Sequence, residues 1–159
     1  MSSVDRVRQA LEAHGLEVQV QELPQSTRTA QLAAQALGCE LGAIVKSLLF
    51  LADDRPVLVL VSGDRRADPM RLRLLLGAGQ VGLAGADRVR AETGFAIGGV
   101  PPVGHRQPIP VVVDRELSRF ARLWAAAGTP NAVFPITFAQ LVAVTGGQEA
   151  DISLAEAAA

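Results

Sequence analysis

The sequence predicts one domain of the mixed α/β class, and three observations support that prediction. The chain has 159 residues, of which 49% are hydrophobic and 19% charged, which is enough apolar material for one compact core. Segments with helical spacing and segments with strand patterning follow one another in irregular order. Neither an internal repeat nor a linker interrupts them. We therefore expect a single domain over residues 1–159 with mixed sheet and helix.

Apolar residues at helical spacing, together with capping residues and terminal glycines, predict five helices. The second has its N-cap at Ser26 or Thr27, and the third begins with Asp68 and Pro69. The predicted helices cover residues 4–13, 27–37, 69–76, 87–92 and 137–144.

Alternating or continuous apolar residues predict the strands. Residues 43–51 and 56–61 are almost uninterruptedly apolar, which is typical of strands buried on both faces, and the polar turn 52–55 joins them. We expect a frayed tail at residues 155–159. The further predicted strands are residues 16–23, 81–84, 110–113, 123–126 and 132–134.

Composition excludes several classes of protein. The formal net charge is −1, so any contact with nucleic acid has to come from a local basic patch. Cys39 is the only cysteine and cannot form an internal disulfide, which fits a cytoplasmic location. The N-terminal segment lacks the apolar stretch of a secretion signal. Residues 123–148 carry no charge, but their glycines and prolines argue against a membrane span.

Lys46 is the most informative residue. It is the only lysine among 15 lysine and arginine residues, and it lies within the apolar strand 43–51. Strand alternation places it on one face with Ile44, Leu48 and Phe50. An ammonium group there is either desolvated or lines a cavity, and its pKa can be tuned as that of an arginine cannot. The alternative is that Lys46 has no functional role and that its side chain extends to water at the edge of the strand.

Ser47 adjoins Lys46, which raises the question of a serine–lysine pair. Neighbouring strand residues point to opposite faces, so the hydroxyl is expected to point away from the ammonium. The S-x-x-K spacing is also absent, because Ala43 stands at the serine position. Covalent serine chemistry is therefore not predicted.

A glycine- and proline-rich loop over residues 98–105 is the second signal. Gly98 and Gly99 permit unusual φ angles and close approach of a ligand to main-chain amides. Pro101 and Pro102 would stiffen the loop and hold those amides in place. An ordinary connecting loop explains the composition equally well. The pattern matches neither a dinucleotide-binding fingerprint nor a P-loop.

The remaining reactive residues point to no metal site. His14 and His105 are far apart in sequence and have no cysteine cluster near them, so zinc is not expected. His105 closes the glycine-rich loop, where it could contact a ligand, and Cys39 fits a small buried side chain better than a nucleophile. Arginines concentrate between residues 65 and 90, where they form either a solvated face or a phosphate-binding one: Arg65, Arg66, Arg71, Arg73, Arg88 and Arg90.

Four segments in this order give the chain a resemblance to the YbaK-like aminoacyl-tRNA deacylases and to the related editing domain of bacterial prolyl-tRNA synthetases. They are Ser26-Thr27, the strand 44–49 with Lys46, the loop 98–105 and the turn 128–131. The resemblance implies a β-barrel-like sheet surrounded by helices. It also implies a free-standing hydrolase that acts in trans on the acceptor end of mischarged tRNA, without cofactor, metal or membrane.

The resemblance also implies roles for particular residues. Lys46 would hold the terminal nucleotide, and the amides near Gly98 and Gly99 would position the ester and the attacking water or ribose 2′-hydroxyl. The sequence offers no catalytic triad, so positioning and the substrate's own hydroxyl would carry the reaction. The residues expected to contact substrate are Thr27, Val100, Pro101, His105, Thr129 and Asn131.

One departure bears on specificity. Some relatives that remove cysteine carry an aspartate after the glycine turn, where this chain has the apolar segment 132–134. That difference favours removal of Ala, Ser or Thr over Cys, with tRNA-Pro as one candidate carrier. Two alternatives stay open: a binding module that holds aminoacyl-tRNA without hydrolysing it, and an unrelated hydrolase that acts on small esters.

Overall fold

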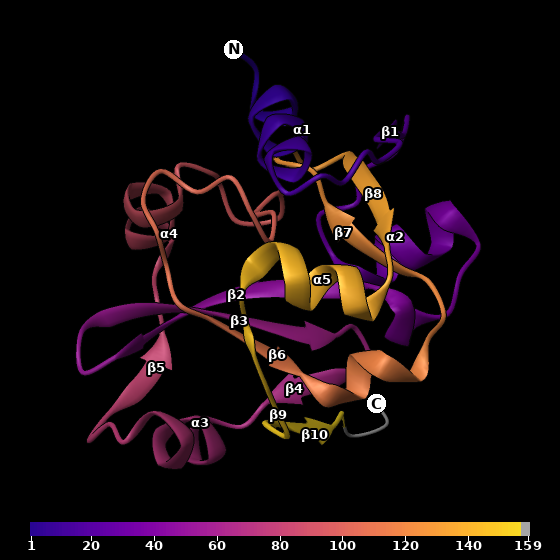
Figure 1. The fold of residues 1–159 in the computed structure, drawn as a ribbon. Helices are drawn as coiled ribbons and strands as arrows, with labels where there is room; N and C mark the ends of the chain where they lie inside the picture. The colour runs from indigo at the N-terminus through magenta and orange to yellow at the C-terminus, as the bar shows by residue number, and fades with distance from the viewer. Residues whose placement is uncertain (157–159) are drawn as a thin grey trace.

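The computed structural model describes residues 1–156 and shows a mixed α/β fold, as predicted (Figure 1). Among the described residues, no helix is long and apolar enough to cross a membrane. The helices are α1 (Ser3–Ala13), α2 (Ala30–Leu37), α3 (Pro69–Leu76), α4 (Ala86–Thr93) and α5 (Phe138–Thr145), with 3₁₀ helices η1 (Leu41–Ala43) and η2 (Arg115–Arg119). The strands are β1 (Gln21–Glu22), β2 (Val45–Ala52), β3 (Arg55–Ser62), β4 (Arg65–Ala67), β5 (Val81–Leu83), β6 (Val111–Asp114), β7 (Leu123–Ala126), β8 (Ala132–Ile136), β9 (Gln148–Ala150) and β10 (Ser153–Ala155).

A five-stranded sheet in the order β5-β2-β3-β6-β9 forms the centre of the fold. β2 and β3 are antiparallel, whereas β6 pairs in parallel with β3 and with β9. Asp53 and Asp54 turn the β2–β3 hairpin with φ angles of 49° and 67°, the left-handed values that a two-residue turn of type I′ requires. The long hairpin crosses the whole molecule (Figure 1).

Smaller sheets flank this centre, and the described strands do not close into a barrel. β1, β8 and β7 form one antiparallel sheet, and β10 pairs with β4 in another. β7 reaches β2 through a single parallel bridge between Ile44 and Trp124. The mixed sheets and surrounding helices implied by the resemblance are present, but the barrel-like arrangement stays open, because among the described residues the only pairing of β7 with the central sheet is this one bridge.

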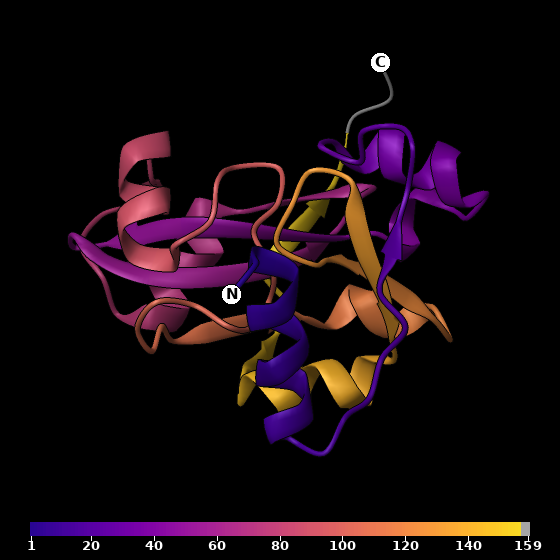
Figure 2. The ribbon, with the colours of Figure 1, turned by 90° about the horizontal axis from the view of Figure 1, so that it is seen from above.

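Apolar side chains cover both faces of the central sheet, as the continuous apolar runs predicted. Leu58 and Leu60 belong to the larger core, which includes residues of α1, α4, α5, β7 and β8. Val59 and Val61 point into a second core that is closed by α3. Figure 2 shows α1 and α5 together on one side of the β2–β3 ribbon. Complete burial of one such side chain contributes about 1.5–3 kcal/mol to folding.

Two predicted elements differ near the N-terminus. Residues 16–23 form a strand only at Gln21–Glu22, because the rest of that segment packs on the core without a strand partner. α2 begins after the N-cap Thr29, whose hydroxyl accepts a hydrogen bond from the Leu32 amide at 3.2 Å. Thr27 is not the cap. Its hydroxyl donates to the Pro130 carbonyl at 2.9 Å and ties this segment to the turn 128–131.

The C-terminal segment is ordered at least to Glu156, so the predicted frayed tail is wrong for Ala155, which pairs with Arg65 in the β10–β4 ladder. Residues 157–159 lie outside the described residues. Asp114 explains the order, since its buried carboxylate accepts hydrogen bonds from the Ile152 amide at 3.1 Å and the Ser153 hydroxyl at 2.6 Å. A buried carboxylate is stable only with such partners.

Candidate functional site

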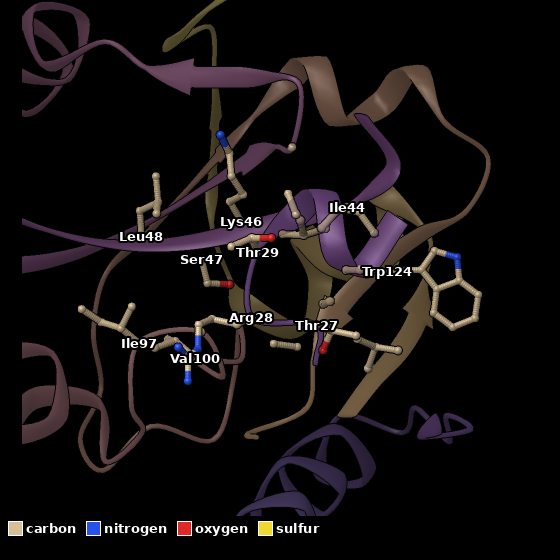
Figure 3. A pocket seen from close by; sticks show the side chains of 18 of the residues that line it. Thr27, Arg28, Thr29, Ile44, Lys46, Ser47, Leu48, Ile97, Val100 and Trp124 are labelled. Carbon is tan, nitrogen blue, oxygen red and sulfur yellow. The ribbon is translucent and has the colours of Figure 1, made fainter. Parts of the chain in front are cut away.

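A cavity of about 500 Å³ lies beside β2, between the start of α2, the loop at residues 97–100 and the β7–β8 hairpin (Figure 3). Its wall is mostly apolar and includes Ile44, Val133 and Trp124. Four residues that the sequence singled out line it: Thr27, Lys46, Gly98 and Val100.

The cavity exists because the central sheet divides along the outer edge of β2. Among the described residues, β7 pairs with this edge only through the bridge at Ile44, just before β2, and β5 pairs with it only from Phe50 to Ala52. Between these two contacts, in the described part of the chain, no strand pairs with the outer edge. We call this gap the fork; it is centred on Ser47.

Lys46 extends from β2 at the cavity and is the charged group around which the site is built. Its side chain is 23% exposed. The ammonium donates a hydrogen bond to the Arg65 carbonyl and lies 3.8 Å from a carboxylate oxygen of Glu156. Burial lowers the pKa of Lys46 from its ordinary value, and the carboxylates of Glu156 and Asp64 partly oppose that shift. Because an ammonium has three donors, this cation retains capacity for a negatively charged ligand.

Of the two adjacent glycines in the glycine-rich loop, only Gly98 lines the cavity. Gly98 lines the cavity with a φ angle of +95°, which L side chains rarely adopt. Gly99 instead packs against the turn 128–131: a Cβ built on it would lie 2.9 Å from the carbonyl carbon of Thr129. The Gly99 amide donates to the Ala96 carbonyl at 3.0 Å and is therefore occupied.

The remaining expected contact residues do not line the cavity. Thr129 and Asn131 are joined by a side-chain hydrogen bond of 3.1 Å, and the Asn131 amide nitrogen donates to the Leu23 carbonyl at 3.3 Å. Pro101 is buried, and its carbonyl lies 2.7 Å from Nε2 of His105. These residues join the loops behind the cavity wall.

His105 is enclosed beneath the loop. Its ring meets Phe95 edge-on at a centroid distance of 6.4 Å. Burial lowers the pKa of His105, and the hydrogen bond with the Pro101 carbonyl partly opposes that shift. Through the hydrogen bond with the Pro101 carbonyl, the imidazole stabilises the loop at residues 101–105.

The side chains of three of the six arginines in the arginine-rich segment make hydrogen bonds or ion pairs with other described residues of the protein. Arg65 and Arg71 donate to the main chain or side chain of Ser153, at 2.6–3.1 Å. Arg88 forms ion pairs with Asp54 at 3.0 Å and Glu92 at 2.9 Å. These guanidinium groups hold β10, the hairpin tip and α4 in place.

The cavity-lining residues that sequence reasoning missed include Arg28, Trp124 and Glu156. Trp124 is the only tryptophan, which was a usable signal. Arg28 lies between two threonines with nothing in its pattern to mark it, and Glu156 stands in a segment that the sequence described as frayed. Figure 3 shows the Arg28 side chain beside Ile97 and Val100.

The described residues include no group of three or more His, Cys, Asp or Glu side chains placed to hold a metal ion. Burial raises the pKa of the half-buried Cys39 thiol, which disfavours the nucleophilic thiolate.

Comparison with known proteins identifies the family to which this chain belongs. Residues 24–144 match the aminoacyl-tRNA editing domain, and the chain belongs to that family. A solved structure of a protein proposed as a trans-editing enzyme for prolyl tRNA synthetase is 48% identical, covers 97% of this chain and 98% of its own, and superposes with a TM-score of 0.90.

Two curated relatives show how this domain occurs in other proteins. The proline–tRNA ligase of Nitratidesulfovibrio vulgaris (strain DP4) is 43% identical over 81 residues, which are 51% of this chain but only 14% of the ligase. EbsC of Enterococcus faecalis, proposed as a Cys-tRNA(Pro)/Cys-tRNA(Cys) deacylase, is 26% identical over 80% of this chain and 79% of its own length. The resemblance drawn from the sequence is confirmed.

Proposed function

We propose that this chain is an aminoacyl-tRNA deacylase that removes a small amino acid from mischarged tRNA in trans. The observation that carries the proposal is the half-buried ammonium of Lys46 at a cavity of about 500 Å³ whose wall is mostly apolar. A cation there suits the phosphate of a terminal nucleotide, and the apolar wall suits an uncharged aminoacyl group. Such an activity belongs in the cytoplasm, where charged tRNA is used.

The reaction is hydrolysis of the ester between the amino acid and the terminal ribose. A water oxygen bonds to the acyl carbon, the bond to the ribose oxygen breaks, and that oxygen takes up a proton. Lys46 binds and orients the nucleotide, and the Gly98 segment brings main-chain groups close to the ester. Because the cavity presents no nucleophile–base pair among the residues that line it, the substrate's 2′-hydroxyl assists the water.

Small amino acids fit the cavity best. The part of the wall that β7 and β8 supply, with Ala125, Ala126 and Val133, carries no carboxylate, which favours Ala, Ser or Thr over Cys. Selection by pocket size is modest, about 10–200-fold per methylene, so neighbouring amino acids should be removed at reduced rates. EbsC makes cysteine a necessary member of any substrate panel, and the ligases make tRNA-Pro the first carrier to test.

The test is deacylation of tRNA-Pro charged in turn with Ala, Cys, Ser, Thr and Pro, with Lys46→Ala as the inactive control. We expect hydrolysis of at least one of the small aminoacyl esters and slower reaction when the terminal 2′-hydroxyl is absent. Binding without hydrolysis across the panel would instead establish a carrier module. Hydrolysis of simple esters, with no reaction on charged tRNA, would establish a small-molecule hydrolase.

A further inference from the structure

Ser47 lies in the middle of the fork, and the reaction proposed above assigns it no role. Its hydroxyl is buried and has no hydrogen-bond partner among the described residues. Figure 3 shows the Lys46 and Ser47 side chains leaving β2 on opposite sides, as strand alternation predicts, with Ser47 on the side of Arg28 and Val100. An unsatisfied buried hydroxyl costs about 1–3 kcal/mol, which suggests that a ligand completes it.

The main chain of Ser47 also faces the fork. The Ala84 amide donates to the Leu49 carbonyl at 3.0 Å, so the main-chain groups of Leu49 point outward from β3. In an antiparallel strand the groups of alternate residues point to the same side, and Ser47 is two residues from Leu49. β5 and β7 do not pair at Ser47, so an N–H donor and a C=O acceptor face the cavity between them.

An aminoacyl ester carries the same N–Cα–C=O unit as a residue of a polypeptide. Two residues directly opposite in an antiparallel pair can exchange both N–H···O=C hydrogen bonds. An amino group and an acyl carbonyl on one ligand can therefore satisfy the C=O and N–H of a single strand residue. Ser47 lies between the Ile44 bridge and the hydrogen bond from the Ala84 amide to the Leu49 carbonyl, so a ligand with one donor and one acceptor can pair with it there.

We propose that Ser47 is a positioning residue that holds the aminoacyl group as if it were one further strand residue, an inference that rests on the proposed function. The α-amino group donates to the Ser47 carbonyl, and the acyl carbonyl accepts from the Ser47 N–H. This arrangement holds the acyl carbon beside the Gly98 loop and leaves Lys46, on the opposite side of β2, to the nucleotide.

The pairing also orients the amino-acid side chain. Directly opposite residues of an antiparallel pair place their side chains on the same face of the sheet. The side chain of an L-amino acid would therefore lie beside the Ser47 hydroxyl and the apolar wall at Val100. A D-amino acid would direct its side chain toward the Lys46 side, where the nucleotide binds.

The first experiment compares L-alanyl-, propionyl- and D-alanyl-tRNA, each as acceleration over its own rate in buffer. Propionyl-tRNA lacks only the α-amino group, and we expect its acceleration to fall at least about tenfold, the size of one lost hydrogen bond to a charged group. D-Alanyl-tRNA is expected to fall by at least as much. Equal acceleration of all three would overturn the pairing while leaving the deacylase intact. Failure to hydrolyse any aminoacyl-tRNA in the panel would overturn the proposed function itself, and the pairing with it.

The second experiment uses Ser47→Ala and compares seryl- with alanyl-tRNA. If the hydroxyl faces the amino-acid side chain, kcat/KM for the seryl ester falls several-fold more than for the alanyl ester, because only the seryl side chain loses a partner. A purely structural role would lower both in parallel, and an unchanged ratio would overturn the placement of the side chain. Ser118→Ala is the matched control, since that hydroxyl is exposed and donates only to the Arg115 carbonyl at 2.7 Å.

Discussion

Lys46 and the guanidinium groups of Arg65 and Arg71 lie at the same end of the central sheet but are used differently. The two arginines together make three hydrogen bonds to Ser153, and so fasten β10 to β4 and α3. Lys46 makes one hydrogen bond to a main-chain carbonyl and one long ion pair with Glu156, whose side chain is 52% exposed. The planar guanidinium group of arginine suits several fixed hydrogen bonds at once, whereas the compact ammonium keeps donors for a ligand.

This contrast teaches that a count of basic residues does not tell which of their charges remain available to a ligand. Three of the six arginines in the segment, Arg65, Arg71 and Arg88, make side-chain contacts with other described residues of the protein, whereas the lone lysine lies at a cavity. An exposed ion pair such as that of Glu156 contributes at most about 1 kcal/mol, so a phosphate can displace it.

The largest expected effect is that of Lys46→Ala on deacylation. Removing a charged donor aimed at substrate lowers kcat by about 100–1000-fold. The melting temperature should hold or rise slightly, because the change removes a half-buried charge. Lys46→Arg should fail to restore activity, since a planar guanidinium does not fit the site of an ammonium. Rates and melting curves for both variants, with Arg66→Ala as control, measure this. Wild-type turnover by the arginine variant would contradict the role given to Lys46.

For the buried carboxylate of Asp114 we expect the opposite result, a loss of stability with little change in activity. Asp114→Ala leaves the Ile152 N–H and the Ser153 O–H without an acceptor in the core, which should lower the free energy of unfolding by about 1–3 kcal/mol. Activity per folded molecule should change little, because Asp114 does not line the cavity. Urea unfolding and deacylation of the same preparation separate the two quantities. A stable variant would mean that β10 is held by the arginines alone.

Much of the fold could be predicted because local rules determine it. Apolar runs identified the β2–β3 hairpin, and Asp68 with Pro69 marked the start of α3. The strand expected over residues 16–23 was wrong because alternation indicates burial on one face but supplies no hydrogen-bonding partner. The order of the C-terminal segment depends on Asp114, 39 residues before Ser153, and no local pattern records such a contact.

The site was predictable only in part, for a related reason. Lys46 stood out by its uniqueness and its apolar surroundings, and Gly98 by the need for a positive φ angle. Arg28 and Glu156 reach the cavity through tertiary structure alone. Thr129 and Asn131 carry polar groups typical of a pocket, but their hydrogen bonds to each other and to Leu23 determine their place in the fold.

The two glycines of the loop should respond differently to alanine. Gly99→Ala introduces a Cβ 2.9 Å from the Thr129 main chain, so the loop and the turn 128–131 must move apart and the melting temperature should fall. Gly98→Ala places a Cβ 2.8 Å from Cγ of the cavity residue Arg28, which must shift, and its strained φ angle costs about 1–2 kcal/mol. We expect Gly98→Ala to lower kcat/KM about tenfold per folded molecule. Parallel loss of stability and activity in both variants would contradict this separation.

Acid should destabilise the protein through His105. Burial lowers its pKa in the folded state, so the unfolded chain binds more protons as the pH falls below about 6.5. The stability conferred by the neutral imidazole is therefore present above this pH and is lost progressively as the pH falls toward the lowered pKa. His105→Gln should flatten that part of the stability curve, by less than about 1.4 kcal/mol per pH unit. Equal slopes in the variant and the wild type would show that His105 protonates freely when folded.

The smallest effect is expected from charge reversal on the exposed face of the arginine-rich segment. Arg66 and Arg73 are exposed, and neither lines the cavity. At physiological ionic strength, exposed charges are screened beyond about 8 Å, so Arg66→Glu with Arg73→Glu should change kcat/KM by no more than about twofold. The slope of log affinity against log salt should also stay shallow, because a footprint at the acceptor end engages few phosphates. Arg28→Ala is the informative comparison, since Arg28 lies at the cavity itself and should weaken binding more than both reversals together. A tenfold loss from the double reversal, with a shallower salt slope, would instead place the body of the tRNA across α3. The arginine-rich segment would then bind substrate as well as hold the fold together.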